Sequence, residues 1–449
     1  MKSLQLLQWK RPYSHLILVL LLYKMLRNLK EWTRPFSDDI VLMKSIPWTI
    51  ISTISRRYSS GPLYPEWSFA FEIFQSLMKS VAIIFGPKLV KPAENARQFR
   101  KNSERLFRPL AWLSTFRSGY TQQTQVIDNI PVVWLKPKTP TTVSSSSPYI
   151  LLYFHGGGYC VMSPTSHVPM LCRILQKTQE LWEKSYPGES REIQALLVDY
   201  RKAPEHVFPA ALEDARCCYE YLITTLHIPP SKIIVAGDSA GGGLALTLLL
   251  DLRAAGARMP AASMCISPYS NVLEELSDQE HDIIAPPQAS IVKHVFLKDQ
   301  ELCLMHSPLL NNLSGLPPTF IQVGTLEILY PQILRLASRA HADGSPVVLD
   351  IHTNMPHIFP FFDAFLLPYS EVGIAALGKF AAHHFQQHST MTTTDSSILP
   401  GPMKRNVSSV QLGKENCFHP PDYMLSPPLK LKFRRVQSAN VLNETPPFA

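Results

Sequence analysis

The stretch Lys232–Gly243, which reads KIIVAGDSAGGG, decides the fold of this 449-residue chain. Apolar β-branched residues predict a buried strand over 232–236, and an apolar run predicts a helix over 240–255. Because so few residues separate strand from helix, the turn between them must be sharp. It holds the hydroxyl of Ser239 clear of the sheet, at a helix N-terminus that stabilises a developing negative charge.

Glycine is scarce in this chain, and its distribution marks two places where the backbone itself is used. Of the 19 glycines, seven fall in two short clusters: Gly156, Gly157, Gly158, Gly237, Gly241, Gly242 and Gly243. In the second cluster, Gly237 and Gly241 keep side chains out of the crowded crossing of strand and helix beside Ser239.

The first glycine cluster follows another predicted strand and lies well before Ser239 in the chain. The backbone N–H groups of Gly156 and Gly157 can point into a cavity, where we expect them to bind an oxyanion together with the N–H of Ala240. His155 is expected to brace this loop rather than act as a base. The two residues after the cluster are expected to line the pocket without taking part in chemistry: Tyr159 and Cys160.

From Tyr149 onward, short β-rich runs alternate with helical patterns. The expected strands cover 149–154, 194–198, 232–236, 262–266, 319–323 and 346–351. The expected helices cover 166–184, 208–225, 240–255, 331–342 and 360–386. Two further strands, at 126–127 and 132–135, are joined by an Asp-Asn turn. This alternation predicts an α/β fold with a mostly parallel eight-stranded sheet and helices on both faces.

Four regions are expected along the chain. Residues 36–117 form a helical cap, because apolar residues recur there at three- and four-residue steps. Residues 118–388 form the α/β domain, and the Ser-, Thr- and Pro-rich residues 389–449 form a disordered basic tail. Residues 1–35 hold an apolar run, 16–23, between basic residues, which favours a membrane-anchoring or interfacial helix. A buried lid helix and a cleaved signal are the alternatives.

The charge is distributed unevenly. The chain has a net charge of +8, of which residues 1–60 carry +7 and residues 401–449 carry +4, so the body between them is at −3. A nucleic-acid enzyme carries its positive charge on the folded body, so we exclude nucleic acid as a partner.

The motifs together resemble a known family. The segments HGGG at 155–158, DYRKAPE at 199–205, FPAA at 208–211 and GDSAGG at 237–242 resemble the hormone-sensitive lipase-like branch of α/β hydrolases. That branch includes arylacetamide deacetylases and fungal steryl acetyl hydrolases. The resemblance spans about residues 125–385, and it implies an α/β-hydrolase fold with an N-terminal helical cap. The residues that support the motifs are His155, Gly158, Gly237, Asp238 and Gly241.

The catalytic order in this fold is serine, acid, histidine. Ser239 is the expected nucleophile. The acid is expected just past a strand, where Glu327 stands at a position that is usually Asp in the family. The base is expected on the loop after the last strand, where His357 matches the family's H-x-F. The competing residues, which lie in or at the end of that strand, are Asp350 and His352.

The resemblance implies a serine esterase or deacetylase acting on a lipophilic, short-acyl ester, such as an acetylated sterol or a secondary metabolite. One alternative is an amide or formamide hydrolase of the kynurenine formamidase type, although Gly158 favours the ester branch. Another is a non-catalytic small-molecule receptor on the same scaffold, which the presence of His357 disfavours.

No cofactor and no metal are expected, because nothing in this mechanism needs one and the histidines at 383–388 have no carboxylate or thiol close by. The expected partners are the ester substrate and, through the N-terminus, a membrane. The expected location is membrane-associated, at the endoplasmic reticulum before others, with cytoplasmic or secreted locations as alternatives. The oligomeric state is left open.

Overall fold

A single sheet organises the molecule. The computed structural model describes residues 39–88, 92–139, 147–187, 191–287, 293, 296, 307–390 and 433–436. The strands are β1 (Tyr120–Ile127), β2 (Ile130–Pro137), β3 (Tyr149–Phe154), β4 (Ile193–Val198), β5 (Ile233–Asp238), β6 (Ala262–Ile266), β7 (Thr319–Gly324), β8 (Val347–His352) and β9 (Phe433–Val436). They follow the order β1-β2-β4-β3-β5-β6-β7-β8-β9. The first eight confirm the predicted sheet.

The direction of the strands gathers the functional segments at one edge. β1 and β2 form an antiparallel hairpin and β2 pairs antiparallel with β4. From β4 to β9 all neighbours are parallel. Every residue of the central strands β3, β5 and β6 is buried, as in sheets covered on both faces. The carboxyl ends of β5, β6, β7 and β8 therefore lie side by side, where such sheets bind ligands.

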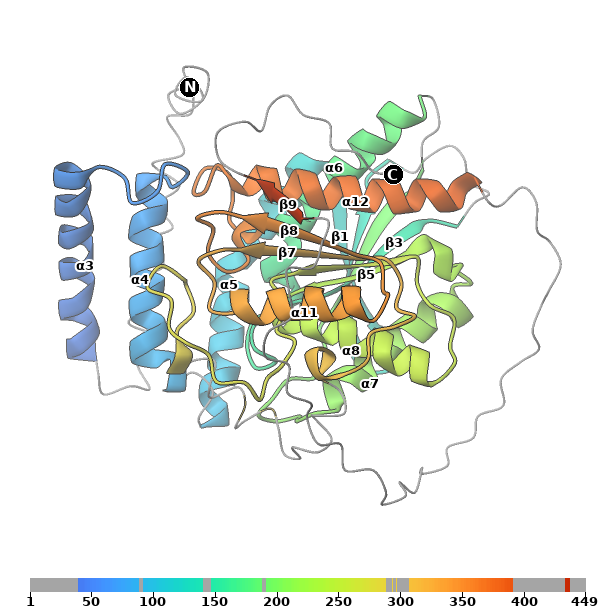
Figure 1. Ribbon diagram of the computed structural model, residues 1–449, viewed down its shortest axis with the longest axis horizontal. Coiled ribbons are helices and arrows are strands. Elements are labelled where there is room, and N and C mark those ends of the chain that lie inside the picture. The colour runs from blue at the N-terminus through green and yellow to red at the C-terminus, as the bar shows by residue number, and fades with distance from the viewer. Residues whose placement is uncertain are drawn as a thin grey trace.

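Helices cover both faces of the sheet, as the alternation predicts. They are α6 (Pro164–Ser185), α7 (Ala210–Glu220), α8 (Ala240–Ala254), α11 (Tyr330–Ala342) and α12 (Ser370–Thr390). Figure 1 shows α6 and α12 on one face and α7, α8 and α11 on the other. Short helical turns complete the α/β part: η2 (Tyr221–Thr225), η3 (Pro230–Lys232), η4 (Pro308–Leu310) and η5 (Phe359–Phe361).

The region expected to be the cap holds α3 (Asp39–Ser60), α4 (Phe69–Phe85), η1 (Gly86–Lys88) and α5 (Ala93–Ser118). α5 packs against α6 and β1, and α3 lies on the outer side of α4 (Figure 1). Trp67 and Phe71 pack in one buried cluster with Met355, Phe359 and Phe362. The indole N–H of Trp67 also donates to the carbonyl of Asn354 at 2.8 Å, so the start of α4 is fastened to the loop after β8.

The last helix differs from its prediction. The sequence predicts a helix over 360–386, whereas η5 ends at Phe361 and α12 begins only at Ser370. Pro368 disfavours helical backbone at the residue before it. Residues in the intervening segment, Phe362, Leu366 and Leu367, bury their side chains in the cluster around Trp67 instead. Tertiary packing thus overrides the local helical pattern.

Both ends of the chain lie largely outside the described residues. Within the tail that the sequence predicts to be disordered, Phe433–Val436 forms β9 and pairs with β8, and the remainder beyond α12 lies outside the described residues. The expected N-terminal helix at 1–35 also lies outside them. Among the described helices, none is long and apolar enough to cross a bilayer.

Candidate active site

Ser239 sits on a strained turn between β5 and α8. Its backbone has φ 51° and ψ −120°, a conformation that side chains rarely adopt. Two backbone hydrogen bonds hold it there: the N–H of Ser239 donates to the carbonyl of Ile266 at 2.8 Å, and the N–H of Tyr269 donates to the carbonyl of Ser239 at 2.8 Å. The strain is of the kind found at functional sites.

The flanking glycines are required by close approach of backbones. A Cβ on Gly237 would lie 2.4 Å from the carbonyl carbon of Gly241, and a Cβ on Gly241 would lie 2.0 Å from the carbonyl oxygen of Phe154. No side chain fits at either place without moving the main chain. The geometry therefore confirms that Gly237 and Gly241 keep side chains out of the crossing of strand and helix.

His357 and Glu327 form a buried pair at the same edge of the sheet. Nδ1 of His357 lies 3.1 Å from Oε2 of Glu327, and both side chains are buried. The other carboxylate oxygen, Oε1, accepts hydrogen bonds from the hydroxyl of Ser267 at 2.7 Å and from the N–H of Gly324 at 2.6 Å. Because Oε1 is held by these two donors, Oε2 is positioned to accept a hydrogen bond from a protonated Nδ1. Nε2 is then the unprotonated, basic nitrogen of the ring.

Ser267 links this pair to the serine turn. It follows directly on Ile266, whose carbonyl holds Ser239, and its hydroxyl contacts Glu327 while accepting the N–H of Ile358 at 3.1 Å. Nε2 of His357 is buried and has no hydrogen-bond partner in the part of the chain that the structure describes. The three residues that the sequence singled out are thus brought to one neighbourhood.

The electrostatics of the pair favour a charged histidine once a proton arrives. Burial alone would lower the pKa of His357, but the hydrogen bond and negative charge of Glu327 outweigh it and raise that pKa above its ordinary value. Burial raises the pKa of Glu327, against the opposing effect of His357. A buried carboxylate beside an imidazolium stabilises the positive charge that general-base catalysis creates.

Asp282 is a site residue that the sequence did not reveal. Its fully buried carboxylate accepts the backbone N–H of His357 at 2.9 Å, that of Ile283 at 2.8 Å and that of Ile328 at 2.8 Å. It therefore ties the loop that carries His357 to the segment that carries Glu327. Nothing in the run DQEHD at 278–282 distinguishes this aspartate from its neighbours.

The structure corrects the assignment of one oxyanion donor. The N–H of Gly156 donates to Oδ1 of Asp238 at 2.9 Å, so it is already engaged and cannot also hold an oxyanion. The N–H groups of Gly157 and Gly158 have no acceptor within the described residues. Ala240 is the first residue of α8, and the first N–H groups of a helix have no partner inside it.

Asp238 is the buried anchor of the glycine loop. Besides Gly156, its carboxylate accepts the hydroxyl of Tyr153 at 2.7 Å and lies 3.2 Å from Nε2 of His167. Burial would raise the pKa of Asp238, but the charge and hydrogen bond of His167 outweigh it and lower that pKa. The structure therefore places an ionised carboxylate behind the loop, where it fixes the position of Gly156.

His155 braces the same loop from the other side. Its ring stacks on Tyr200 with 4.5 Å between ring centroids, and its carbonyl accepts the Tyr200 hydroxyl at 2.7 Å. Burial lowers the pKa of His155 to about 4. A neutral, stacked imidazole of this kind suits a structural role.

The competing pair lies apart from this arrangement. Nε2 of His352 is 2.7 Å from Oδ2 of Asp350, and the amide of Gln322 donates to the same carboxylate oxygen at 3.0 Å. This group sits along β7 and β8 and contacts α12 through the carbonyl of Gly373. It joins elements of the fold to one another and does not reach the Ser239 turn.

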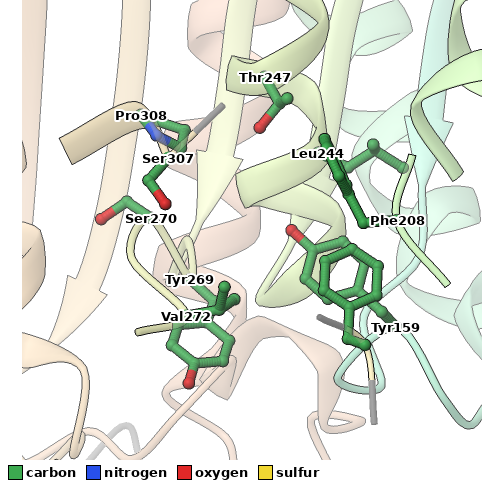
Figure 2. Close-up of a pocket in the computed structure, with 10 residues that line it drawn as sticks. Tyr159, Phe208, Leu244, Thr247, Tyr269, Ser270, Val272, Ser307 and Pro308 are labelled. Carbon is green, nitrogen blue, oxygen red and sulfur yellow. The ribbon is translucent and has the colours of Figure 1, made fainter. Parts of the chain in front are cut away.

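A small cavity lies beside α8, the helix that follows Ser239, and is lined in part by Leu244 and Thr247 of that helix (Figure 2). Its volume is about 30 Å³. It is lined by Tyr159, Phe208, Leu244, Thr247, Tyr269, Ser270, Val272, Phe296, Ser307 and Pro308. Tyr159 stacks on Phe296 with 4.0 Å between ring centroids and forms one wall, as the sequence led us to expect, whereas Cys160 is not among the lining residues. Tyr269, whose backbone N–H donates a hydrogen bond to the carbonyl of Ser239, forms another wall.

No cluster of metal-ligating side chains is found among the residues that the structure describes.

Comparisons with known proteins show which family the sequence resembles. A family profile for the alpha/beta hydrolase fold matches residues 151–361. An acetyl-hydrolase of Streptomyces hygroscopicus is 34% identical over 237 residues, which are 51% of this chain and 74% of that protein. An esterase of Acinetobacter venetianus is 31% identical over 244 residues, 53% of this chain and 76% of that protein.

A solved structure shows the same likeness in three dimensions. The crystal structure of an esterase from the bacterial hormone-sensitive lipase family matches with a TM-score of 0.55 at 28% identity, and the match covers 69% of this chain and 98% of that one. The profile match spans the serine turn, the glycine loop and the His357 loop. The protein is a carboxylic ester hydrolase with the α/β-hydrolase fold, and it belongs to the hormone-sensitive lipase-like family of α/β hydrolases.

Proposed function

We propose that the protein hydrolyses a lipophilic ester with a short acyl group, such as an acetylated sterol or secondary metabolite, through Ser239, His357 and Glu327. The observation that carries this proposal is the buried pair in which Oε2 of Glu327 lies 3.1 Å from Nδ1 of His357, with Nε2 left unbonded among the described residues. That nitrogen is the one that must receive the serine proton.

The chemistry follows in two half-reactions. The hydroxyl oxygen of Ser239 attacks the ester carbonyl carbon while its proton passes to Nε2 of His357. The resulting oxyanion is held by the N–H groups of Gly157, Gly158 and Ala240, because the N–H of Gly156 is committed to Asp238. The C–O bond to the alcohol breaks as His357 returns the proton to the leaving oxygen.

Water completes the second half. His357 removes a proton from a water molecule, the hydroxide attacks the acyl-serine, and the carboxylic acid leaves as Ser239 regains its proton. Glu327 stays ionised throughout and stabilises the imidazolium. This cycle needs no cofactor or metal.

The small cavity along α8 supports a short acyl group. A volume of about 30 Å³ holds on the order of two water molecules, enough for a methyl group but not for a long chain. Four of its walls are apolar or aromatic: Tyr159, Phe208, Leu244 and Tyr269. The name of the Streptomyces relative, an acetyl-hydrolase, agrees with this size.

A lipophilic alcohol part fits the apolar cap. The cluster that joins α4 to the His357 loop contains Trp67, Phe71, Phe359 and Phe362, with Phe74 packed against it. The first four side chains are packed against one another, so it is the apolar character of this region, with the partly buried Phe74 at its edge, that favours an apolar alcohol part.

The test is a chain-length series of p-nitrophenyl esters with purified full-length protein. We expect kcat/KM to fall from acetyl to butyryl to octanoyl, and Ser239→Ala to abolish turnover and labelling by a fluorophosphonate. N-formylkynurenine serves as the comparison substrate, and faster turnover of it than of p-nitrophenyl acetate would favour a formamide hydrolase. A folded protein that the fluorophosphonate does not label would favour a receptor.

A further inference from the structure

Helix α3 is amphipathic in the reverse sense to that of a helix on a soluble protein. A surface helix ordinarily turns its apolar stripe inward and its polar residues outward. In the described part of α3, the one fully buried side chain is that of the polar residue Thr53, whereas four large apolar side chains are exposed. Because this arrangement exposes large apolar groups to water, it requires a reason beyond the stability of the isolated chain.

The inner face of α3 is fastened to α4 by charge. Arg56 and Arg57 each donate to the carboxylate of Glu72, which is 1% exposed, and the same carboxylate accepts the N–H of Leu63 at 3.0 Å. Thr53, which is 5% exposed, lies on the same side. Paired charges of this kind fix the rotation of α3 about its own axis, so the apolar side of the helix is held outward.

The outer face is a stripe, which we call the α3 stripe, of Trp48, Ile51, Ile54 and Tyr58. Their exposed fractions are 72%, 60%, 36% and 92%. At spacings of three, three and four residues they cover about 120° of the helix circumference. Phe69 of α4, which is exposed beneath the guanidinium of Arg57 at 5.5 Å, widens the apolar surface at one end.

Two features, one of the stripe itself and one of the sequence before α3, favour a lipid surface as what covers the stripe. Tryptophan and tyrosine are the residues favoured where apolar lipid meets water, and one stands near each end of the stripe. Residues 1–38, which lead directly into α3, carry seven Lys/Arg against two Asp/Glu and include the apolar run 16–23, whereas the body of the chain is mildly acidic. Attraction to an anionic surface is therefore concentrated in the part of the sequence that leads into α3.

We propose that the α3 stripe docks on the interface of an anionic phospholipid bilayer, with α3 lying along the membrane plane. The apolar side chains then enter the boundary of head groups and acyl chains, as in interfacial helices. One helix, α4, separates this surface from the active site, since α4 contacts α3 on one side and its first residues pack on the loop of His357 on the other. Docking thus presents the site to esters dissolved in the membrane.

The experiment is sedimentation of the full-length protein with phosphatidylcholine vesicles that contain phosphatidylserine. The variant Trp48→Ser/Ile51→Ser/Tyr58→Ser removes most of the stripe. The matched control, Trp112→Ser/Phe116→Ser, removes an aromatic pair on α5 in which each ring is 66% exposed. We expect the stripe variant to need at least about tenfold more lipid for half-maximal binding and the control to bind as the wild type does.

Turnover of p-nitrophenyl acetate, which is soluble, should be the same in all three proteins. This readout separates docking from the proposed function, because a catalytic failure would remove it from the wild type as well. Vesicle binding by the stripe variant equal to that of the wild type would overturn docking by α3, as would a wild type that binds no vesicles.

Two other occupants give distinct results. A wild type that is dimeric by light scattering, with a monomeric stripe variant and no vesicle binding, would assign the stripe to an interface between copies. Protease cleavage within residues 1–38 that becomes faster only in the stripe variant, without lipid, would show that the chain's own N-terminal segment covers it. Either result overturns the membrane proposal.

Discussion

The Ser239 turn and the His357 loop, the two halves of the proposed catalytic site, are held in different ways. Backbone crossings fix the serine turn, where Gly241 lies so close to Phe154 that no Cβ fits between them. Buried side chains that come from separate segments fix the histidine loop: Asp282, Ser267 and Glu327. One half is therefore fixed by close main-chain packing that the glycines of a short motif permit, and the other by side-chain hydrogen bonds among residues that no single motif contains.

This difference predicts how each half fails. A change in the serine turn moves main chain against main chain, and interiors are too closely packed to absorb it. A change in the histidine loop removes one hydrogen bond among several, so the loop stays in place but with a less exact position. The first kind of change costs the fold, and the second costs rate.

The largest effect is expected from Gly241→Ala. Its Cβ would lie 2.0 Å from the carbonyl oxygen of Phe154, so β3 or α8 must shift. We expect the free energy of unfolding to fall by about 3 kcal/mol or more, with loss of esterase activity. Urea denaturation followed by circular dichroism measures it. Gly256→Ala is the control: its φ of +61° is strained, but nothing lies within 4 Å, so the cost should be about 1 kcal/mol. Equal costs at both positions would refute the packing argument.

The next effect is expected from Glu327→Gln. The N–H of Gly324 and the hydroxyl of Ser267 hold Oε1, so the new amide would turn its NH₂ toward Nδ1 of His357. The proton then moves to Nε2, which can no longer accept one from Ser239. We expect kcat to fall by about 10³- to 10⁴-fold with unfolding unchanged within about 1 kcal/mol. Near-normal turnover would show that Glu327 is not the acid of the triad.

The same substitution has a signature in pH. In the proposed mechanism His357 acts as a base only when it is neutral, so activity should rise with pH through the pKa of His357. Glu327 raises that pKa above its ordinary value of 6.5, so the wild-type acid limb should have its midpoint above pH 6.5. In Glu327→Gln, the raising charge is gone and burial lowers the pKa, so the midpoint of the residual activity should move to lower pH. An unchanged midpoint would show that the carboxylate of Glu327 does not raise the pKa of the catalytic base.

A smaller effect is expected from Asp282→Asn. One of its two carboxylate oxygens becomes an NH₂ group. That group would face a backbone N–H, and it cannot accept a hydrogen bond from it. The loop of His357 loosens, and we expect kcat to fall about 10- to 100-fold while KM changes less than about threefold. The control is Asp350→Asn, an equally buried aspartate beside His352, which should leave kcat within about threefold. A rise in KM alone would give Asp282 a role in binding instead.

The contrast between the halves also explains what could be read from the sequence. The strands, the serine turn and the tightly packed glycines follow from local patterns, so 149–154 and 262–266 match the structure at both ends. Asp282, Ser267 and His167 could not be found, because each acts through a partner far along the chain. The oxyanion role that the sequence predicts for Gly156 fails because its N–H donates to Asp238, and no local pattern encodes the direction of that side chain. The same holds for the segment before α12, where packing against Trp67 replaces the predicted helix.

The smallest effect concerns the acyl cavity and extends the comparison beyond the catalytic groups. Phe208 is partly buried and packs edge-on against Phe296, at 5.7 Å between ring centroids. Its ring forms part of the cavity wall, so removing the ring changes the cavity and leaves the main chain in place. In Phe208→Ala the cavity gains room for further methylenes. The ratio of octanoyl to acetyl kcat/KM should therefore rise about tenfold, chiefly through the octanoyl ester. Val126→Ala, at an exposed position on β1, is the control and should leave the ratio unchanged. If Phe208→Ala lowers both esters equally, the acyl group does not enter this cavity, and the wall acts only by supporting the serine turn.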